Sequence, residues 1–183
     1  VASATDTPGV KSTATVGFTT AGRILSGGAI QLVFSEGETF DANPTVTFTP
    51  NTVTGTAVWT AGTSTLVITT GGDAVSADEG TAVSFTLTNM RNAPSIVGAS
   101  TVAITTFDST GTAAGDVIDA GSAATDAITQ GALSTATVAS ATDTPGVKST
   151  ATVGFTTAGR ILSGGAIQLV FSEGETFDAN PTV

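Results

Sequence analysis

Carboxylates are the side chains of this sequence whose type and spacing best suit chemistry, because calcium is bound by several oxygen ligands supplied by loops. Three groups of acidic residues stand close together along the chain, in segments expected to form turns. They are Glu36, Glu38 and Asp41; Asp73, Asp78 and Glu79; and Asp116, Asp119 and Asp126. None has the alternating Asp spacing of a calcium-binding loop, so surface charge that keeps the chain soluble is the competing interpretation. We therefore predict no cofactor, with calcium at these residues as the alternative.

Two side chains on which many enzymes depend are missing. The chain contains no cysteine and no histidine, which excludes thiolate zinc sites, cysteine nucleophiles and the Ser-His-Asp triad. Two carboxylates can act as acid and base in a glycosidase, but few aromatic residues stand near the acidic groups. The single tryptophan, Trp59, lies in an alternating segment, which favours a core position over a sugar platform. We predict that the protein is not an enzyme.

The charge balance excludes two classes of partner. Five lysines and arginines against fifteen aspartates and glutamates give a formal net charge of −10, which disfavours nucleic acid and anionic lipid. No apolar run approaches the length of about 18 residues that spans a membrane. Residues 1–9 do not resemble a secretory signal, which has a basic region followed by a long apolar one. We predict no binding of nucleic acid and no membrane insertion.

An internal repeat organises the chain. Residues 138–183 are identical, letter for letter, to residues 1–46, and each residue is numbered 137 above its counterpart, as with Val1 and Val138. This period exceeds the 20–50 residues or so of a solenoid turn and matches one whole domain of about 100–150 residues. The sequence therefore predicts a tandem array with one domain per repeat. Duplication during cloning is the alternative.

Within the repeat, the pattern indicates strands. Short stretches rich in Val, Ile, Phe and Thr alternate between apolar and polar residues and are bounded by Gly, Pro, Asn and Asp. The strands expected are residues 12–20, 29–34, 45–49, 53–60, 64–70, 82–88 and 101–107, with 1–4 and 135–141 opening the two units. Ala61-Gly62-Thr63 fits a three-residue hairpin loop. Residues 113–127 read as a loop or as a weak strand around Val117.

Many short alternating strands predict an all-β fold with two antiparallel sheets packed as a sandwich; an up-and-down barrel is the alternative. Its core is expected to hold Val16, Phe18, Ile30, Leu32, Phe34, Phe48, Trp59, Leu66, Ile68, Val83, Phe85, Leu87, Val102 and Ile104. Residues 108–130 are poor in large apolar side chains, which places a unit boundary near Gly131. We predict a complete unit at 1–131 and the first third of the next unit at 132–183.

The runs STATVGFTT (12–20), AIQLVFSEG (29–37) and EGTAVSFTLTNMRNAPSIVGASTVAITTFDSTG (79–111) carry a resemblance to a known class. The chain resembles the immunoglobulin-like units of very large tandem-repeat extracellular proteins, among them surface-layer-associated proteins and giant microbial adhesins. The resemblance implies an immunoglobulin-like β-sandwich in an extracellular or cell-surface stalk, fibre or coat. It transfers no functional residue, and calcium within or between units is common in that class.

Two functions follow as expectations. The first is a structural repeat unit of an extracellular filament, stalk or surface coat, with neighbouring units or chains of the same protein as its partners. The second is an adhesive module of a giant surface adhesin that binds a carbohydrate or a protein and is rigidified by calcium. Adhesive arrays vary at the tip and use their inner units as spacers. Two strings of 46 residues without one difference favour the structural unit.

The repeat also predicts an unsatisfied segment. Residues 1–46 and 138–183 are the same string, so both complement the single copy of residues 47–137, and only one can pack against it. The other exposes apolar side chains that belong in a core, and it leaves strand edges unpaired. These side chains are Val153, Phe155, Ile161, Ile167, Leu169 and Phe171. The remainder of a following unit, or a neighbouring chain by strand exchange, is the expected partner.

Overall fold

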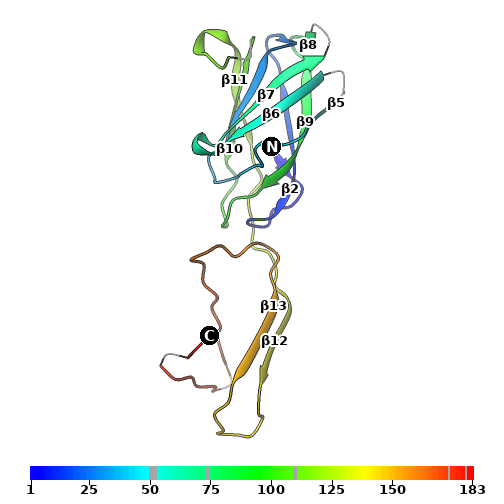
Figure 1. Cartoon of the computed structure of the whole chain (residues 1–183). Coiled ribbons are helices and arrows are strands. Elements are labelled where there is room, and N and C mark those ends of the chain that lie inside the picture. Colours follow the sequence, from blue (N-terminus) through cyan, green and yellow to red (C-terminus); the bar gives the residue numbers. More distant parts are fainter. Residues whose placement is uncertain (50–52, 73–74, 109–110, 173, 180) are drawn as a thin grey trace.

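The computed structural model describes residues 1–49, 53–72, 75–108, 111–172, 174–179 and 181–183. Strands hold 46% of the residues and helices 4%, and every strand pair is antiparallel, which confirms the all-β prediction. Figure 1 shows two bodies, one above the other. We call residues 1–129 the first body and residues 134–183 the second body. No helix in the described part of the chain is both long and apolar enough to cross a membrane.

Two sheets form the first body. One has the strand order β1 (Ala2–Ser3), β2 (Lys11–Thr19), β9 (Ala82–Arg91) and β5 (Val46–Thr49). The other has the order β11 (Val117–Ala124), β10 (Thr101–Phe107), β4 (Ala29–Val33), β7 (Thr65–Gly72) and β6 (Val53–Thr60). A short ladder joins β3 (Ile24–Leu25) to β8 (Val75–Ala77). Two single-turn 3₁₀ segments complete the body, η1 (Ala61–Thr63) and η2 (Ala114–Asp116).

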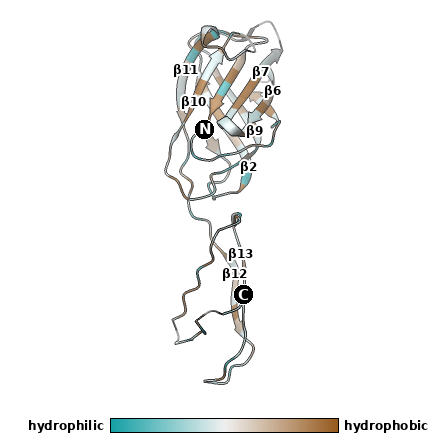
Figure 2. Ribbon diagram, turned by 60° about the vertical axis from the view of Figure 1, so that its left-hand side comes forward, coloured by the Kyte–Doolittle hydropathy of each residue, from teal (hydrophilic) through white to brown (hydrophobic). Residues whose placement is uncertain are grey.

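The core lies between these sheets and follows from alternation along the strands. In β2, for example, Ala14 and Val16 are buried while Thr13, Thr15 and Gly17 face outward. Figure 2 shows hydrophobic residues alternating with more polar ones along the strands of the upper body. Thirteen of the fourteen expected core residues, Trp59 among them, are buried, and Phe18 packs half-buried against them. The architecture is therefore that of a β-sandwich.

Alternation located the strands that border the core, and the structure adds three more. Strands β6 and β10 have the predicted bounds, and Ala61–Thr63 forms the predicted connection between β6 and β7. Strands β3 and β8 are too short to show a pattern. Residues 117–124 form a full strand that pairs with β10, although only a loop or weak strand was expected. Most of its residues are small and exposed, so no alternation of apolar and polar side chains marks it in the sequence.

A β-bulge extends β9 beyond its predicted end. The register pairs Ala14 with Leu87 and Ser12 with Met90, so β9 carries one residue more than β2 across this interval. Asn89 supplies it with a φ of 61°, a left-handed conformation that asparagine tolerates better than most residues. The extra residue changes the phase of the strand, and Leu87 and Met90 both point into the core. Two residues after Met90, the polar residue Asn92 is buried as well.

The first and last segments of the first body lie side by side. The Val1 ammonium donates a hydrogen bond to the Ala124 carbonyl at 2.5 Å. Further along, the Thr129 amide donates to the Asp6 carbonyl at 2.8 Å. Because both numbers rise together between these two bonds, the segments run in the same direction.

The second body reproduces the opening of the first. Strands β12 (Ser134–Ser140) and β13 (Ala151–Thr156) pair Ala139 with Thr152 and Ser140 with Ala151, the counterparts of the Ala2–Thr15 and Ser3–Ala14 pairs. Residues 166–170, the counterpart of β4, form no strand. Within the described residues, the second string therefore forms its local strand pair, but its counterpart of β4 has no neighbouring strands like those that flank β4 in the first body.

Apolar side chains of the second body are exposed to solvent. Ile161, Ile167 and Leu169 are 49%, 59% and 47% exposed, whereas the counterparts of the last two, Ile30 and Leu32, are fully buried. Phe171 packs against Phe177 with ring centroids 4.9 Å apart, as Phe34 packs against Phe40 at 5.2 Å. Val153, Phe155 and Phe171 are half-buried. The predicted exposure is thus confirmed for three of the six residues.

The two bodies meet at a turn near Pro8. A Cβ on Gly159 would collide with the Pro8 carbonyl oxygen, so only glycine allows this approach. In the first body the counterpart glycine, Gly22, is covered instead by the side chain of Ile118. Pro8 therefore lies against Gly159 in the place that Ile118 of β11 takes against Gly22 in the first body.

Candidate functional site

The structure disperses the first group of acidic residues. The Asp41 carboxylate lies 2.7 Å from the Lys11 ammonium, in an exposed ion pair that Lys148 and Asp178 repeat in the second body. Glu38 is buried and accepts a hydrogen bond from the Glu36 amide at 3.1 Å. The Glu36 carboxylate in turn accepts from the Ser100 hydroxyl at 2.9 Å. Each carboxylate thus has its own partner, and the three do not converge.

The other two groups are likewise divided. Asp73 lies outside the described residues, while Asp78 pairs with Arg23 at 3.4 Å and Glu79 is exposed. The Asp119 carboxylate binds the backbone of a turn, and Asp126 faces the N-terminus of the chain. Across the ranges that the structure describes, no three acidic side chains are close enough to hold a metal ion together. A calcium site made by these groups stays a prediction without geometric support.

Asp119 has a structural role that the sequence did not indicate. Its carboxylate accepts hydrogen bonds from the amides of Ala21, at 3.2 Å, and Gly22, at 3.0 Å, which ties β11 to the turn after β2. Charge-assisted hydrogen bonds of this kind contribute more than neutral ones.

We expect Asp119→Ala to lower the free energy of unfolding of the first body by about 1–2 kcal/mol, because two turn amides lose a charged acceptor at a partly exposed site. Urea unfolding followed by Trp59 fluorescence measures this loss. Asp143→Ala, at an exposed position of the second body, is the matched control. Equal midpoints for the two variants would contradict the role assigned to Asp119.

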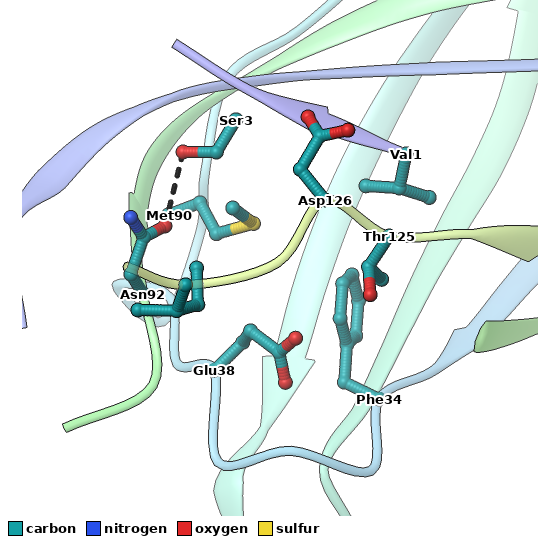
Figure 3. A pocket seen from close by; sticks show the side chains of 9 residues that line it. Val1, Ser3, Phe34, Glu38, Met90, Asn92, Thr125 and Asp126 are labelled. Atoms are coloured by element: carbon teal, nitrogen blue, oxygen red, sulfur yellow. Dashed lines mark hydrogen bonds between the residues drawn. The ribbon is translucent and has the colours of Figure 1, made fainter. Parts of the chain in front are cut away.

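A small cavity lies beside the N-terminus of the first body (Figure 3). Val1, Phe34, Glu38, Met90 and Asp126 are among the residues that line it. Its volume is about 10 Å³, roughly that needed for one water molecule, so it does not suit an organic ligand. Burial lowers the pKa of the Val1 ammonium, and the nearby Asp126 carboxylate opposes this shift.

Asn92 is the polar centre of this region. Its side-chain amide donates to the carbonyls of Thr5 and Thr7, the latter at 3.1 Å, and its carbonyl accepts from the Ser3 hydroxyl at 3.0 Å (Figure 3). The Asn92 backbone amide also donates to the Val10 carbonyl at 3.0 Å. A buried side chain with this many partners specifies how residues 3–10 sit against the end of β9. Asn92 therefore anchors the first string to the rest of the unit.

The second body contains a larger, open hollow. It has a volume of about 200 Å³ and is lined chiefly by apolar side chains. They include Leu133, Val138, Val153, Phe155, Ile167 and Leu169. Apart from Leu133, these are the counterparts of Val1, Val16, Phe18, Ile30 and Leu32, which belong to the core of the first body or pack against it. The hollow thus lies where the second body lacks the far side of a sandwich.

Sequence reasoning identified the residues around the hollow through the repeat, but it missed Asn92. The available signal was the interruption of alternation between Leu87 and Met90, which marks a bulge and changes the direction of the side chains after it.

Comparison with known proteins adds no relative: no protein-family model matches the chain, and no curated protein and no solved structure is significantly similar to it.

Proposed function

We propose that this chain is a structural repeat unit of an extracellular filament, stalk or surface coat, built from immunoglobulin-like β-sandwiches in tandem. One observation carries the proposal. A string of 46 residues occurs twice without a difference, and the strand pair at its start has the same register at both places. Identical units in series suit a spacer, whose task is to extend a chain by equal steps.

The correspondence between the strings extends to individual hydrogen bonds. Ser3 accepts or donates to Ser12 at 2.9 Å between hydroxyl oxygens, and Ser140 and Ser149 repeat the pair at 2.8 Å. The Ala4 amide donates to Thr13 at 2.9 Å, as Ala141 does to Thr150 at 2.8 Å. The second string is therefore organised as the beginning of a further unit, which supports tandem repetition.

The geometry of the first body favours a scaffold over a ligand-binding module. Its small cavity holds no more than about one water molecule. Its single tryptophan is in the core, with the ring 5.2 Å from that of Phe40, and so offers no surface for a sugar. Among the candidate acidic residues, Asp41 and Asp78 lie in exposed ion pairs and Asp119 binds the backbone of a turn.

The location is tested by labelling intact cells of the source organism with antibodies against residues 1–137, followed by electron microscopy. Label on surface fibres, stalks or a coat is the expected result. Permeabilised cells provide the control for antibody access. Label that appears only after permeabilisation would overturn the proposal.

A further inference from the structure

The open hollow of the second body is the surface of the molecule with the clearest missing partner. Ile167 and Leu169 line it and are 59% and 47% exposed. Beside them, β13 pairs with β12 along one edge, whereas its counterpart β2 pairs with β1 on one side and β9 on the other. A strand edge next to an apolar hollow favours the addition of a further strand.

The first body shows what covers the same surface when a unit is complete. There β9 lies against β2 and pairs Val16 with Phe85 and Gly17 with Ser84. The side chains of Phe85, Leu66 and Ile68 are fully buried in the same core cluster as Val16, Ile30 and Leu32. All of the covering side chains come from residues 47–137, which we call the complementary segment.

Polar contacts make this cover specific. In the first body the Arg91 guanidinium donates to the Gly9 carbonyl at 2.6 Å, and the side-chain carbonyl of Asn92 accepts a hydrogen bond from the Ser3 hydroxyl. The second body presents the counterparts of these groups in Gly146 and Ser140. The Ser140 hydroxyl already donates to the Thr142 carbonyl at 2.7 Å, as Ser3 does to Thr5. The second string thus holds the shape that Asn92 and Arg91 recognise before any such residues are present.

Exchange between identical chains does not cover this surface. Each chain carries two copies of the string and one complementary segment. When the second string of one chain displaces the first string of another, the displaced string is exposed in its place. A string is therefore packed as the first one is only where an additional complementary segment is present.

We infer that residues 138–183 are a preformed docking surface for a polypeptide with the sequence of residues 47–137, which adds a strand to the free edge of β13 and fills the hollow. The inference rests on the tandem repetition in the proposed function, but not on the location outside the cell. Docking also moves the Gly159 turn away from Pro8, because the residue corresponding to Ile118 takes that place.

The test compares this chain with an extended chain, in which a second copy of residues 47–137 follows Val183. Trypsin provides the readout, since Lys11 and Lys148 are followed by the same residues and give fragments of different mass. Lys11 begins β2, whereas Lys148 lies outside any strand. We expect cleavage after Lys148 to be at least about 100-fold faster than after Lys11 in the 183-residue chain, and equally slow in the extended chain.

The control carries Phe85→Asp only in the appended copy, which places a charge where the hollow should be filled. In this variant, cleavage after Lys148 should remain fast, while slow cleavage after Lys11 reports that the first body is intact. Fast cleavage after Lys148 in the extended chain without the substitution overturns the inference. So does slow cleavage in the 183-residue chain, including protection that increases with its concentration, because the string would then pack without the added segment. Antibody labelling of cells decides the location separately.

Discussion

Replacing Ile30 by alanine is expected to lower the free energy of unfolding of the first body by about 2–5 kcal/mol, whereas the same change at Ile167 should alter it by less than about 0.5 kcal/mol. The two isoleucines occupy the same place in identical strings, yet Ile30 is fully buried and Ile167 is 59% exposed. In the sheet, Ile30 lies between Ile68 of β7 and Thr106 of β10. Its truncation leaves a cavity among packed neighbours, while truncation of Ile167 leaves none.

Trp59 makes this comparison measurable, because it is the single tryptophan and lies in the core of the first body. Its fluorescence should follow urea unfolding of that body and not of the second. With a denaturant dependence of about 1–3 kcal/mol per molar urea, Ile30→Ala should lower the midpoint by at least about 0.7 M.

The comparison also decides which string packs against residues 47–137. If the second string were the one in place, Ile167→Ala would cause the loss and Ile30→Ala would not. The double variant should be no less stable than Ile30→Ala alone. A further loss in the double variant would show that the second string replaces a damaged first string.

Asn92→Ala is expected to cost about 2–4 kcal/mol of stability in the first body. The change leaves the carbonyls of Thr5 and Thr7 without the Asn92 donor and the Ser3 hydroxyl without one acceptor, in a partly buried region. Urea unfolding by Trp59 fluorescence again gives the value. A loss below about 0.5 kcal/mol would show that residues 3–10 are held by backbone pairing alone.

Two control variants separate the hydrogen bonds of Asn92 from its packing. Asn92→Asp retains the size of the side chain but removes its donors, so it should lose most of what alanine loses. Ser3→Ala should cost about 1 kcal/mol, since it removes the hydroxyl that contacts Asn92, Thr5 and Ser12. Ser140→Ala should be close to neutral, because its site in the second body is exposed and the Asn92 contact belongs to Ser3.

Strands that border a core could be predicted from the sequence because burial imposes alternation on them. This is why β6 and β10 have the expected bounds and why Trp59 lies inside. Strand β11 was not predicted as a full strand, since its mostly small and exposed residues show no alternation. The end of β9 was not predicted for another reason: the bulge at Asn89 shifts the alternation of apolar and polar residues by one position.

The candidate sites differed in the same way. The hollow of the second body follows from counting copies of the string, which needs no knowledge of side-chain position. The acidic groups were defined by closeness along the chain, and folding separates their members: Asp41 turns to Lys11, while Asp119 reaches the turn at Gly22. Closeness along a chain implies closeness of carboxylates only where one loop curls around a common point, as calcium-binding loops do.

The parallel course of the first and last segments of the first body bears on how such a unit carries tension. Residues 1–6 and 124–129 are joined by hydrogen bonds from Val1 to Ala124 and from Thr129 to Asp6. A pull on the two ends of the body drags these segments past each other in opposite directions, so the bonds between them are loaded together. Bonds in shear break as a group, at a higher force than bonds that open one after another. In the stalk proposed above, this pairing would set the tension at which a unit begins to unfold more than the size of the core does.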